Sequence, residues 1–479
     1  MVFSFTIFLF ILPIIFILYW SAGRDNLKFQ NRLLLATSYY FYSWWDWRFL
    51  FLILFSTLLD FYTGLKIQNT QSAKTRKYWL VLSLIINLGF LGIFKYYNFF
   101  TESFLSLFNV SDHSYHLLIA NIILPIGISF YTFHGLSYVF DVYNKRRSPT
   151  SNIVNYSLFV SFFPLLLAGP IERATHLLPQ IENIRKFDLN ASKDGLRQIL
   201  WGLFKKLVIA DNCATYVNLI FNHSTTYNSQ TLIIGAILFS FQIYCDFSGY
   251  SDIAAGLSKL FGFEIIQNFS TPYFSKNISE FWKRWHISLS TWFRDYVYIP
   301  LGGNKLGPTR TIVNLIITFL LSGLWHGANW TFIVWGALNA AYYIVERFVI
   351  NKFFGVTKYL KNDIFLRINY FIQIVFTFIL ITFGWIFFRA DSLKSAKEYI
   401  KGIFYSSKTL ASSVTIPIEL YLLIFIFLIV EWIGKDDTFT LRKILPSSSF
   451  VVRWFIYYLL IFVIIAATKK GEEFIYFQF

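Results

Sequence analysis

Residues 368–388 read INYFIQIVFTFILITFGWIFF, and this stretch contains no charged side chain. A bilayer core is about 30 Å thick, so a spanning helix needs about 20 mostly apolar residues. Because lipid offers no hydrogen-bonding partners, the backbone of such a stretch has to satisfy its own polar groups, which a helix does. The stretch therefore predicts a membrane-spanning α-helix.

Similar apolar runs recur along the 479 residues, of which 56% are apolar and only 14% charged. Soluble domains carry about a quarter charged residues. The alternating pattern of membrane β-strands is absent. We therefore expect an all-α, polytopic membrane protein with about eleven membrane helices, some runs being too short or too interrupted to span. The runs are 2–20, 32–44, 48–65, 78–94, 117–140, 153–168, 198–221, 231–250, 311–345 (interrupted near 324–327), 368–388, 417–434 and 450–467.

The net charge of +16 resides mainly in short loops between these runs. Lys and Arg gather in loops 21–31, 66–77 and 143–152, whereas 95–116 is nearly neutral and 222–230 has neither. Basic loops stay in the cytoplasm, so we expect the N-terminus outside. Membrane topology and anionic lipid headgroups therefore account for the charge, and no nucleic-acid partner is expected.

No internal repeat or low-complexity linker divides the chain, so we expect a single integral membrane domain over residues 1–479. The first run, 2–20, lacks a basic leader and a small-residue cleavage site, which predicts a retained first span. Cys213 and Cys245 lie in apolar surroundings without a CxxC or zinc-ligand neighbour. We expect both to be packed as small apolar side chains, without a disulfide.

Residues 259–310 interrupt the apolar pattern, because they are too polar to span and too aromatic for a solvated loop. Within them, Phe281, Trp285 and Leu289 recur at intervals of four residues, which predicts an amphipathic helix over 278–297. Such a helix lies at the membrane interface or re-enters the protein.

The two ends of this helix are also predictable. Asn277 or Ser279 is a suitable N-terminal cap, and Glu280 faces Arg284 one turn further on. A proline and two glycines follow at 300–303 and are expected to end the segment.

His326 lies in LLSGLWHGANWTFIVWG, residues 320–336, inside an apolar stretch. An ionisable residue within a membrane segment is costly and usually marks function. Gly323 and Gly327 remove side-chain bulk, which permits a helix break and the close approach of a ligand to the backbone. The alternative interpretation is a histidine that only packs between helices.

The chemistry available around His326 suits acyl transfer. An imidazole titrates near neutrality, so it can take a hydroxyl proton as the oxygen attacks a thioester. Trp325 and Asn329 add stacking and hydrogen-bonding groups. No HExxH, GxSxG or P-loop motif occurs, so no metal site and no nucleotide hydrolysis are expected.

His286 is the second candidate and lies in the amphipathic stretch, 40 residues before His326, so only the fold can bring the two together. The alternative is an interfacial histidine held by packing. Asp246 and Asp252 interrupt the apolar run 239–263. Acids at membrane depth need partners or water. They either orient His286 and line a cavity, or form a buried polar network that holds helices together.

The other histidines carry weaker signals. His113, His116 and His223 lie in loops expected outside, where a solvated side chain is the simpler interpretation. His134 and Asp141 stand seven residues apart on one helix face, and we expect structural roles for them.

Six stretches together resemble the membrane-bound O-acyltransferase superfamily, and within it the bacterial branch that O-acetylates polysaccharides such as alginate. They cover about residues 125–396. The stretches are GISFYTFHGLSYVFDVY, FFPLLLAGPIER, QIYCDFSGYSDIAAGLSKLFGF, EFWKRWHISLSTWFRDYVYIPLGGNKLGPTRT, LSGLWHGANWTFIVWG and WIFFRADSLKSA.

The resemblance implies a fold of about eleven helices around a central funnel or tunnel, with interfacial or re-entrant helices. It also implies that His326 is catalytic, as base or acyl relay, and that His286 assists. Asp246 and Asp252 would organise the cavity.

The resemblance further implies a multi-pass protein of the bacterial cytoplasmic (inner) membrane with no bound cofactor. The acyl donor would be acetyl-CoA or another cytoplasmic thioester, and a periplasmic acetyltransferase partner would complete delivery. An acyl carrier protein is a second candidate source of the thioester. Arg284 and Arg294 would contact donor phosphates or the acidic carrier protein, unless they only set topology.

Two alternatives stay open. Within the same family, the reaction would be D-alanyl transfer to teichoic acid or O-acetylation of peptidoglycan. From another class, the protein would be a transporter or channel without bond chemistry. Transporters usually show inverted repeats with paired broken helices, and this sequence shows no internal symmetry.

Overall fold

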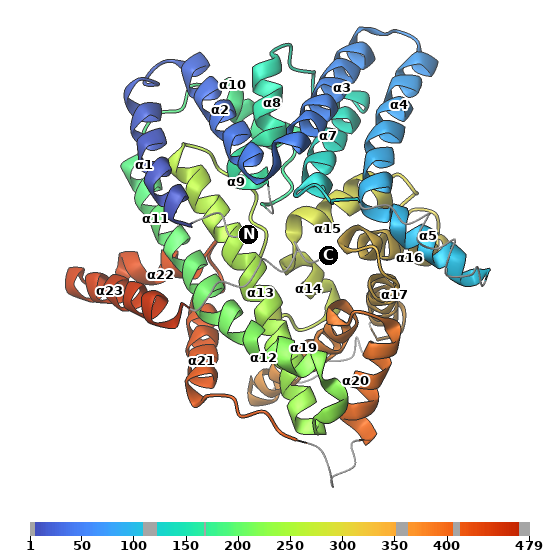
Figure 1. Ribbon diagram of the computed structural model, residues 1–479, viewed down its shortest axis with the longest axis vertical. Coiled ribbons are helices and arrows are strands. Elements are labelled where there is room, and N and C mark those ends of the chain that lie inside the picture. The colour runs from blue at the N-terminus through green and yellow to red at the C-terminus, as the bar shows by residue number, and fades with distance from the viewer. Residues whose placement is uncertain (1–4, 109–121, 167–168, 351–362, 406–411, 469–479) are drawn as a thin grey trace. The chain divides into compact units, whose positions relative to one another are not determined.

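The computed structural model is helical along the chain (Figure 1). It describes residues 5–108, 122–166, 169–350, 363–405 and 412–468. In these residues, β structure is limited to one isolated bridge, between Tyr227 and Ser412. The all-α class predicted from the apolar runs is therefore confirmed. The chain forms two compact units, Met1–Leu196 with Ala254–Ile266, and Arg197–Ile253 with Gln267–Phe479.

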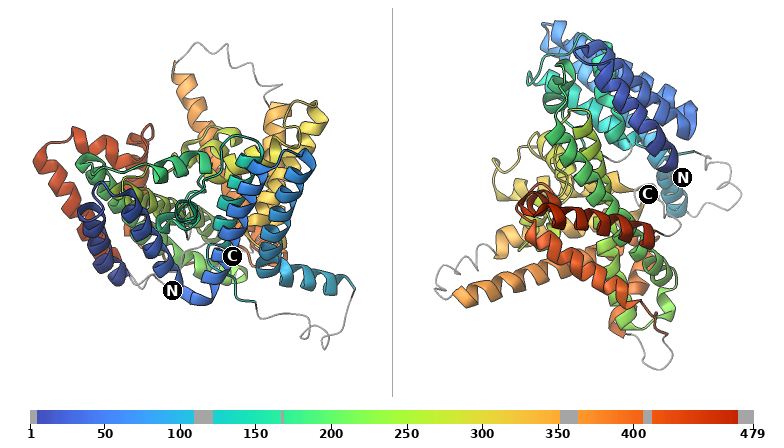
Figure 2. Two further views of the ribbon diagram at one scale, coloured as in Figure 1. Left: turned by 90° about the horizontal axis from the view of Figure 1, so that it is seen from above. Right: turned by 90° about the vertical axis from the view of Figure 1, so that its left-hand side faces the viewer.

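The first unit contains the N-terminal helices. They are α1 (Phe5–Ser21), α2 (Leu27–Asp46), α3 (Leu50–Asn69), α4 (Ala73–Leu91), α5 (Tyr97–Leu107), α7 (Ile128–Tyr143), α8 (Ile153–Ser161), α9 (Phe163–Leu166), α10 (Ala174–Glu182) and the start of α11 (Leu189–Leu203). Helices α3, α4 and α7 pack against one another (Figure 1 and Figure 2). A methyl group on Gly64 of α3 would stand 2.7 Å from the Tyr138 ring of α7, so the glycine permits this close packing.

The second unit contains the longest helix and most of the C-terminal half. Its elements after α11 are the π-helical turn Phe204–Ala210, α12 (Asp211–Asn222), most of α13 (Ser229–Leu260), α14 (Ile278–Arg284), α15 (Ile287–Phe293), the π-helical turn Arg294–Tyr298, α16 (Pro308–His326), α17 (Trp330–Val345), α19 (Asp363–Arg389), α20 (Leu393–Tyr405), α21 (Ile418–Ile433), α22 (Thr440–Ser447) and α23 (Phe450–Ala467).

Helical segments that are long and apolar enough to cross a membrane number six in the described residues. They are Leu27–Asn69, Ala73–Leu107, Ser229–Leu260, Pro308–His326, Phe365–Arg389 and Phe450–Ala467. The first two each contain more than one helix. A multi-pass membrane protein is therefore confirmed, and the count of eleven stays a prediction.

Large apolar side chains on the outside of the helices fit a lipid environment. Phe371 and Phe376 of α19 are 66% and 56% exposed, and Phe455 of α23 is 64% exposed. Monomeric soluble proteins seldom expose contiguous apolar surface on this scale. Exposed aromatic side chains on these apolar helices therefore fit the assignment of α19 and α23 as candidate membrane spans.

The run 153–168 does not form one membrane helix in its described part. It folds as α8 and α9, separated at Phe162. Pro164 has no N–H to continue the hydrogen bonding of α8, but it is tolerated in the first turn of a new helix. At about 1.5 Å per residue, neither piece is long enough to cross a bilayer core.

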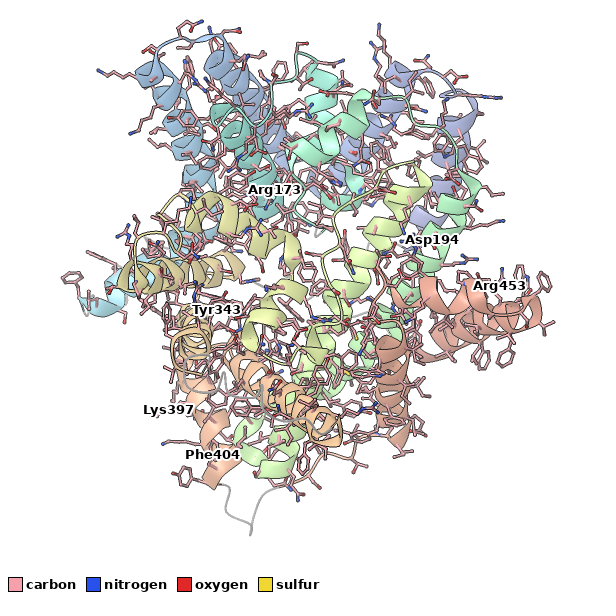
Figure 3. All side chains as sticks on the ribbon, turned by 180° about the vertical axis from the view of Figure 1, so that it is seen from behind. Arg173, Asp194, Tyr343, Lys397, Phe404 and Arg453 are labelled. Carbon is pink, nitrogen blue, oxygen red and sulfur yellow. The ribbon has the colours of Figure 1, made fainter. Side chains whose placement is uncertain are left out.

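Helix α20 has one buried and one exposed face. Ala396 and Tyr399 are buried, and the Tyr399 hydroxyl donates to the backbone oxygen of Leu232 at 2.7 Å. Lys397 and Phe404 are exposed, and Figure 3 labels both on this helix. The helix therefore packs against other helices of the second unit through its apolar side.

Candidate active site

His286 lies at a break between two short helices, α14 and α15. The single amphipathic helix predicted over 278–297 is therefore wrong, although Asn277 caps α14 as predicted by accepting from the backbone N–H of Glu280 at 2.8 Å. His286 adopts the left-handed conformation with φ +43°. This conformation is unfavourable for residues other than glycine, so surrounding contacts have to hold it.

Asn268 supplies those contacts. Its backbone oxygen accepts from the N–H of Ile287 at 2.9 Å. Its side-chain oxygen lies 3.1 Å from His286 Nδ1 and accepts from the N–H of Ser288 at 3.3 Å. These hydrogen bonds replace the ones that a continuous helix would make at His286. The prediction of one helix failed because the periodicity of a sequence does not reveal a hydrogen-bonding partner from another segment. No sequence motif pointed to Asn268.

His326 is the last residue of α16, as the interruption predicted near 324–327 requires. Gly327 follows in an extended conformation, and Asn329 caps α17 by accepting from the N–H of Thr331 at 3.0 Å. The amide nitrogen of Asn329 also donates to the backbone oxygen of Asp391 at 2.8 Å. The structure thus gives Asn329 a role in shaping the backbone next to His326, and a contact with substrate stays a prediction.

Glycines bring α16 and α17 into close contact. A methyl group on Gly323 would stand 2.3 Å from the backbone oxygen of Phe332, and one on Gly336 would stand 2.5 Å from that of Phe319. A methyl group on Gly327 would meet the Phe332 ring. The sequence suggested that Gly323 and Gly327 admit a ligand, but in the structure α17 occupies the space beside both glycines. They hold His326 by packing two helices tightly.

The two candidate imidazoles lie side by side. The ring centroids of His286 and His326 are 6.3 Å apart, and Trp325 contacts both rings, at 5.9 and 5.1 Å. Trp335 and Phe388 approach His326 edge-on at 5.1 and 5.3 Å. His286 and His326 are 1% and 4% exposed. Residues 40 positions apart in the sequence thus share one aromatic enclosure inside the second unit.

Burial affects the charge state of His286, which lies outside the six candidate spans. Desolvation lowers the pKa of the His286 imidazole to about 3, because the charged form loses water. The ring is therefore neutral at physiological pH. A neutral imidazole has one nitrogen that donates and one that accepts a hydrogen bond.

Asp246 and Asp252 belong to a buried ion-pair network. The π-helical turn Phe204–Ala210 presents two successive lysines to α13. Lys206 Nζ lies 2.7 Å from Asp246, and Lys205 Nζ lies 2.6 Å from Asp252. Of the two interpretations of these acids, these contacts favour the network that holds helices together. The lysines were missed, although a charged pair inside the apolar run 198–221 was a usable signal.

The two candidate arginines are engaged within the protein. Arg284 pairs with Glu280 at 2.7 Å, as predicted, and donates to the backbone oxygen of Ser270 at 3.3 Å. Arg294 pairs with Asp295 at 2.7 Å, and its side chain is 58% exposed. A role for either in binding a donor stays a prediction, and the exposure of Arg294 makes it the more accessible of the two.

Two further histidines form a separate polar group in the first unit. His134 is buried, and its Nε2 accepts from the N–H of Glu172 at 3.0 Å. The buried Glu172 carboxylate pairs with His176 Nδ1 at 2.8 Å, and this hydrogen bond raises the pKa of His176. These contacts fit the structural role expected for His134.

His223 is exposed, as expected for a solvated loop residue. His113 and His116 lie outside the residues that the structure describes. Cys213 and Cys245 are buried and not disulfide-bonded, as expected.

The fold and the site together define a class, a multi-pass helical membrane protein with a buried pair of imidazoles. Sequence comparison then identifies the family. The profile of the membrane-bound O-acyltransferase family matches residues 99–388, and the chain belongs to this family. It is therefore an O-acyltransferase, and the resemblance drawn from the motifs over about 125–396 is confirmed.

Individual relatives agree with this assignment. The chain is 38% identical over 457 residues to the probable alginate O-acetylase AlgI of Pseudomonas putida, covering 94% of this chain and 90% of that one. It is 36% identical over 436 residues to the peptidoglycan O-acetyltransferase of Helicobacter pylori, covering 84% and 80%. It is 31% identical over 286 residues to the teichoic acid D-alanyltransferase of Bacillus subtilis, covering 56% and 69%.

Proposed function

We propose that this chain is an O-acetyltransferase component that moves acetyl groups from a cytoplasmic thioester toward an exported cell-envelope polysaccharide such as alginate. The similarity to an alginate O-acetylase over 94% of the chain supports the acceptor class. Acetyl-CoA is the proposed donor, with an acyl carrier protein as the other thioester source. The proposed location is the bacterial inner membrane.

The observation that carries this proposal is the 6.3 Å separation of the His286 and His326 ring centroids. Two buried imidazoles at this distance can contact the same substrate group. One nitrogen accepts the proton of an attacking hydroxyl while the C–O bond forms and the C–S bond breaks. The departing thiolate then takes up that proton. Such general base catalysis contributes about 10²–10⁴-fold to the rate.

We assign the base or acyl-relay role to His326 and the assisting role to His286. His326 ends a helix whose position is fixed by tight packing against α17. The aromatic rings around it exclude water, which strengthens every polar interaction inside the enclosure. Arg294, the more exposed arginine, is proposed to contact donor phosphates or an acidic carrier protein. A periplasmic acetyltransferase is the proposed partner for final transfer.

The test is acetylation of the exported glycan in cells that produce His326→Ala or His286→Ala protein at wild-type levels. Ester-linked acetyl groups are measured by mass spectrometry of the purified glycan. We expect His326→Ala to abolish acetylation and His286→Ala to reduce it at least tenfold, within the range that acid–base residues contribute. The exposed His223→Ala protein is the matched control and should be unaffected. Unchanged acetylation in His326→Ala cells would contradict the catalytic assignment.

The peptidoglycan O-acetyltransferase of H. pylori, 36% identical to this chain, favours peptidoglycan as the second candidate acceptor. The same mass spectrometry separates the candidates when it is applied to muropeptides, to exported polysaccharide and to teichoic acid. If acetylation of muropeptides depends on the protein, the acceptor is peptidoglycan and not an exported polysaccharide. If D-alanine esters on teichoic acid depend on the protein, the acyl group is D-alanyl and the acceptor is teichoic acid.

A further inference from the structure

Asn268 concentrates hydrogen bonds on one side-chain oxygen. The side chain is 2% exposed. Its Oδ1 accepts from the N–H of Ser288 at 3.3 Å and from the Ser288 hydroxyl at 2.9 Å. The same oxygen lies 3.1 Å from His286 Nδ1. Three polar groups from the α14–α15 break therefore converge on one atom.

The orientation of the Asn268 amide follows from its partners. A backbone N–H can only donate, so the atom that faces the N–H of Ser288 has to be the oxygen. The amide nitrogen then points the other way, to the Ser251 hydroxyl on α13 at 3.2 Å. Since an amide oxygen only accepts, His286 Nδ1 has to carry a proton.

We propose that Asn268 is a positioning residue for acyl transfer, which holds His286 as the Nδ1–H tautomer and leaves Nε2 as the nitrogen that accepts a proton or hydrogen bond. This inference rests on the proposed function, because it gives the assisting histidine a defined direction of proton movement. His286 then acts as an acceptor toward the substrate hydroxyl or toward His326. The opposite tautomer would present a donor in the same place.

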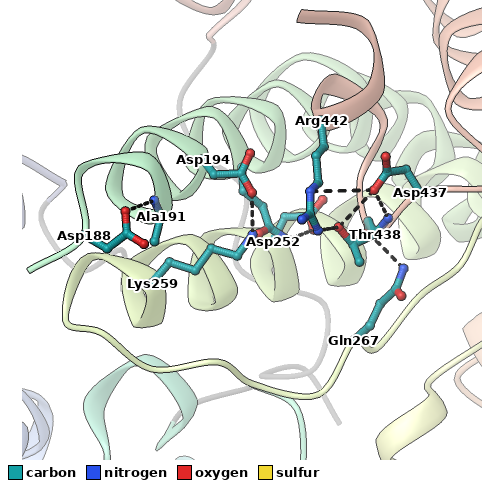
Figure 4. Close-up of polar contacts among 10 residues, drawn as sticks. Asp188, Ala191, Asp194, Asp252, Lys259, Gln267, Asp437, Thr438 and Arg442 are labelled. Atoms are coloured by element: carbon teal, nitrogen blue, oxygen red, sulfur yellow. Dashed lines mark hydrogen bonds and ion pairs between the residues drawn. The ribbon is translucent and has the colours of Figure 1, made fainter. Parts of the chain in front are cut away.

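The segment that carries Asn268 is anchored on both sides. The amide nitrogen of Gln267 donates to the backbone oxygen of Phe269 at 2.8 Å. It also donates to the backbone oxygen of Thr438 at 2.9 Å, as Figure 4 shows. The Phe269 ring stacks over His286 with centroids 6.4 Å apart. Asn268 is therefore held between a clamped neighbour and a stacked neighbour, which limits its freedom to rotate away.

The other faces of the His286 ring carry no charged group among the ring contacts of the described residues. Phe247 approaches edge-on at 4.6 Å and Trp325 at 5.9 Å. A titratable group, His326, faces the ring at 6.3 Å between centroids. Two acids of α13, Asp246 and Asp252, are paired with lysines. An added negative charge at position 268 would lie directly beside His286 Nδ1.

The first experiment observes the tautomer directly. Full-length protein labelled with 15N-histidine is studied by NMR in lipid nanodiscs, and loss of signals in His286→Gln identifies those of His286. We expect the chemical shift of Nδ1 to be that of a protonated nitrogen and that of Nε2 to be that of an unprotonated one. In Asn268→Leu, which removes the acceptor, we expect a mixture of tautomers. A wild-type His286 protonated on Nε2 would overturn the proposal.

The second experiment measures the pH dependence of acetyl transfer. Asn268→Asp has nearly the same shape and keeps an oxygen at Nδ1, but its charge raises the pKa of His286. Protonated His286 cannot accept, so the acidic limb of the kcat profile should move to higher pH. Asn268→Leu should lower kcat about 10- to 100-fold with KM little changed, the order of loss found when a partner that orients a metal-bound histidine is removed.

The matched control is Asn31→Asp. Asn31 is also a buried asparagine, 1% exposed, and it lies in the first unit. Its side-chain oxygen accepts from Arg185 at 2.6 Å, so a carboxylate there has a cation to pair with, and no shift of the pH profile is expected. An unshifted profile in Asn268→Asp together with wild-type kcat in Asn268→Leu would overturn the proposal. If the His326→Ala and His286→Ala proteins still acetylate, the proposed function fails, and the NMR result still decides whether Asn268 sets the tautomer.

Discussion

Gly323→Ala is the substitution whose effect follows most directly from the structure. The added methyl group would stand 2.3 Å from the backbone oxygen of Phe332 on α17, where ordinary contact begins at 3.4 Å. The obstacle is backbone, so it cannot rotate aside as a side chain would. Helices α16 and α17 would therefore have to separate locally by about 1 Å.

This displacement reaches the site because His326 is three residues further along the same helix. A misplacement of about 1 Å can lower a rate by about 100-fold. We therefore expect a loss of about 100-fold in acetyl transfer. Overpacking of this kind also lowers the free energy of unfolding by about 1–3 kcal/mol.

The assay is acetyl transfer per folded enzyme in nanodiscs, with thermal unfolding measured in parallel. Two glycine variants are controls. Gly384→Ala adds a methyl group at an ordinary 3.7 Å from the Trp335 ring, which borders the site. Gly89→Ala adds one with nothing within 4 Å. Both should keep near-wild-type activity. If Gly323→Ala matched them in rate and stability, the argument that glycine packing positions His326 would be refuted.

Two further outcomes concern charge. Lys205→Met leaves the half-buried Asp252 without its lysine, although Gln198 still donates to it. The free energy of unfolding in mixed micelles should therefore fall by up to about 3 kcal/mol, and Lys205→Met/Asp252→Leu should recover most of this. No recovery in the double variant would contradict the pairing. Glu172→Gln removes the group that raises the pKa of His176. The wild-type protein should therefore exceed the variant in stability most below pH 6.5, and this difference in stability should shrink as the pH rises through the raised pKa. A stability difference that does not depend on pH would contradict the pairing of Glu172 with His176.

Several features could be predicted from local sequence. The uncharged run 368–388 lies within α19, and Asn277 caps α14 as its position suggested. The helix interruption beside His326 was also expected, because Gly323 and Gly327 lie on both sides of this histidine. These features depend on neighbours within one or two turns, so hydropathy, periodicity and capping preferences are enough to find them.

Other features could not be predicted, because they depend on contacts across long stretches of chain. The regular spacing of Phe281, Trp285 and Leu289 predicted one continuous helix. In the structure this segment is divided at His286, where the backbone oxygen of Asn268 accepts from the N–H of Ile287. Likewise, Asp246 and Asp252 were open to two interpretations until Lys205 and Lys206 were found opposite them. Periodicity reports which face is apolar, and it carries no information about which distant polar group meets that face.

Sequence alone was enough to establish a helical membrane protein, its acyltransferase family and the two histidines worth testing, because apolar length and extended motifs are properties of the chain itself. The folded chain decided that His286 and His326 lie 6.3 Å apart between their ring centroids, that Gly323 serves helix packing, and that Asn268 faces Nδ1 of His286. Those relations join residues far apart in the sequence, and only the packing of helices against one another determines which of them meet.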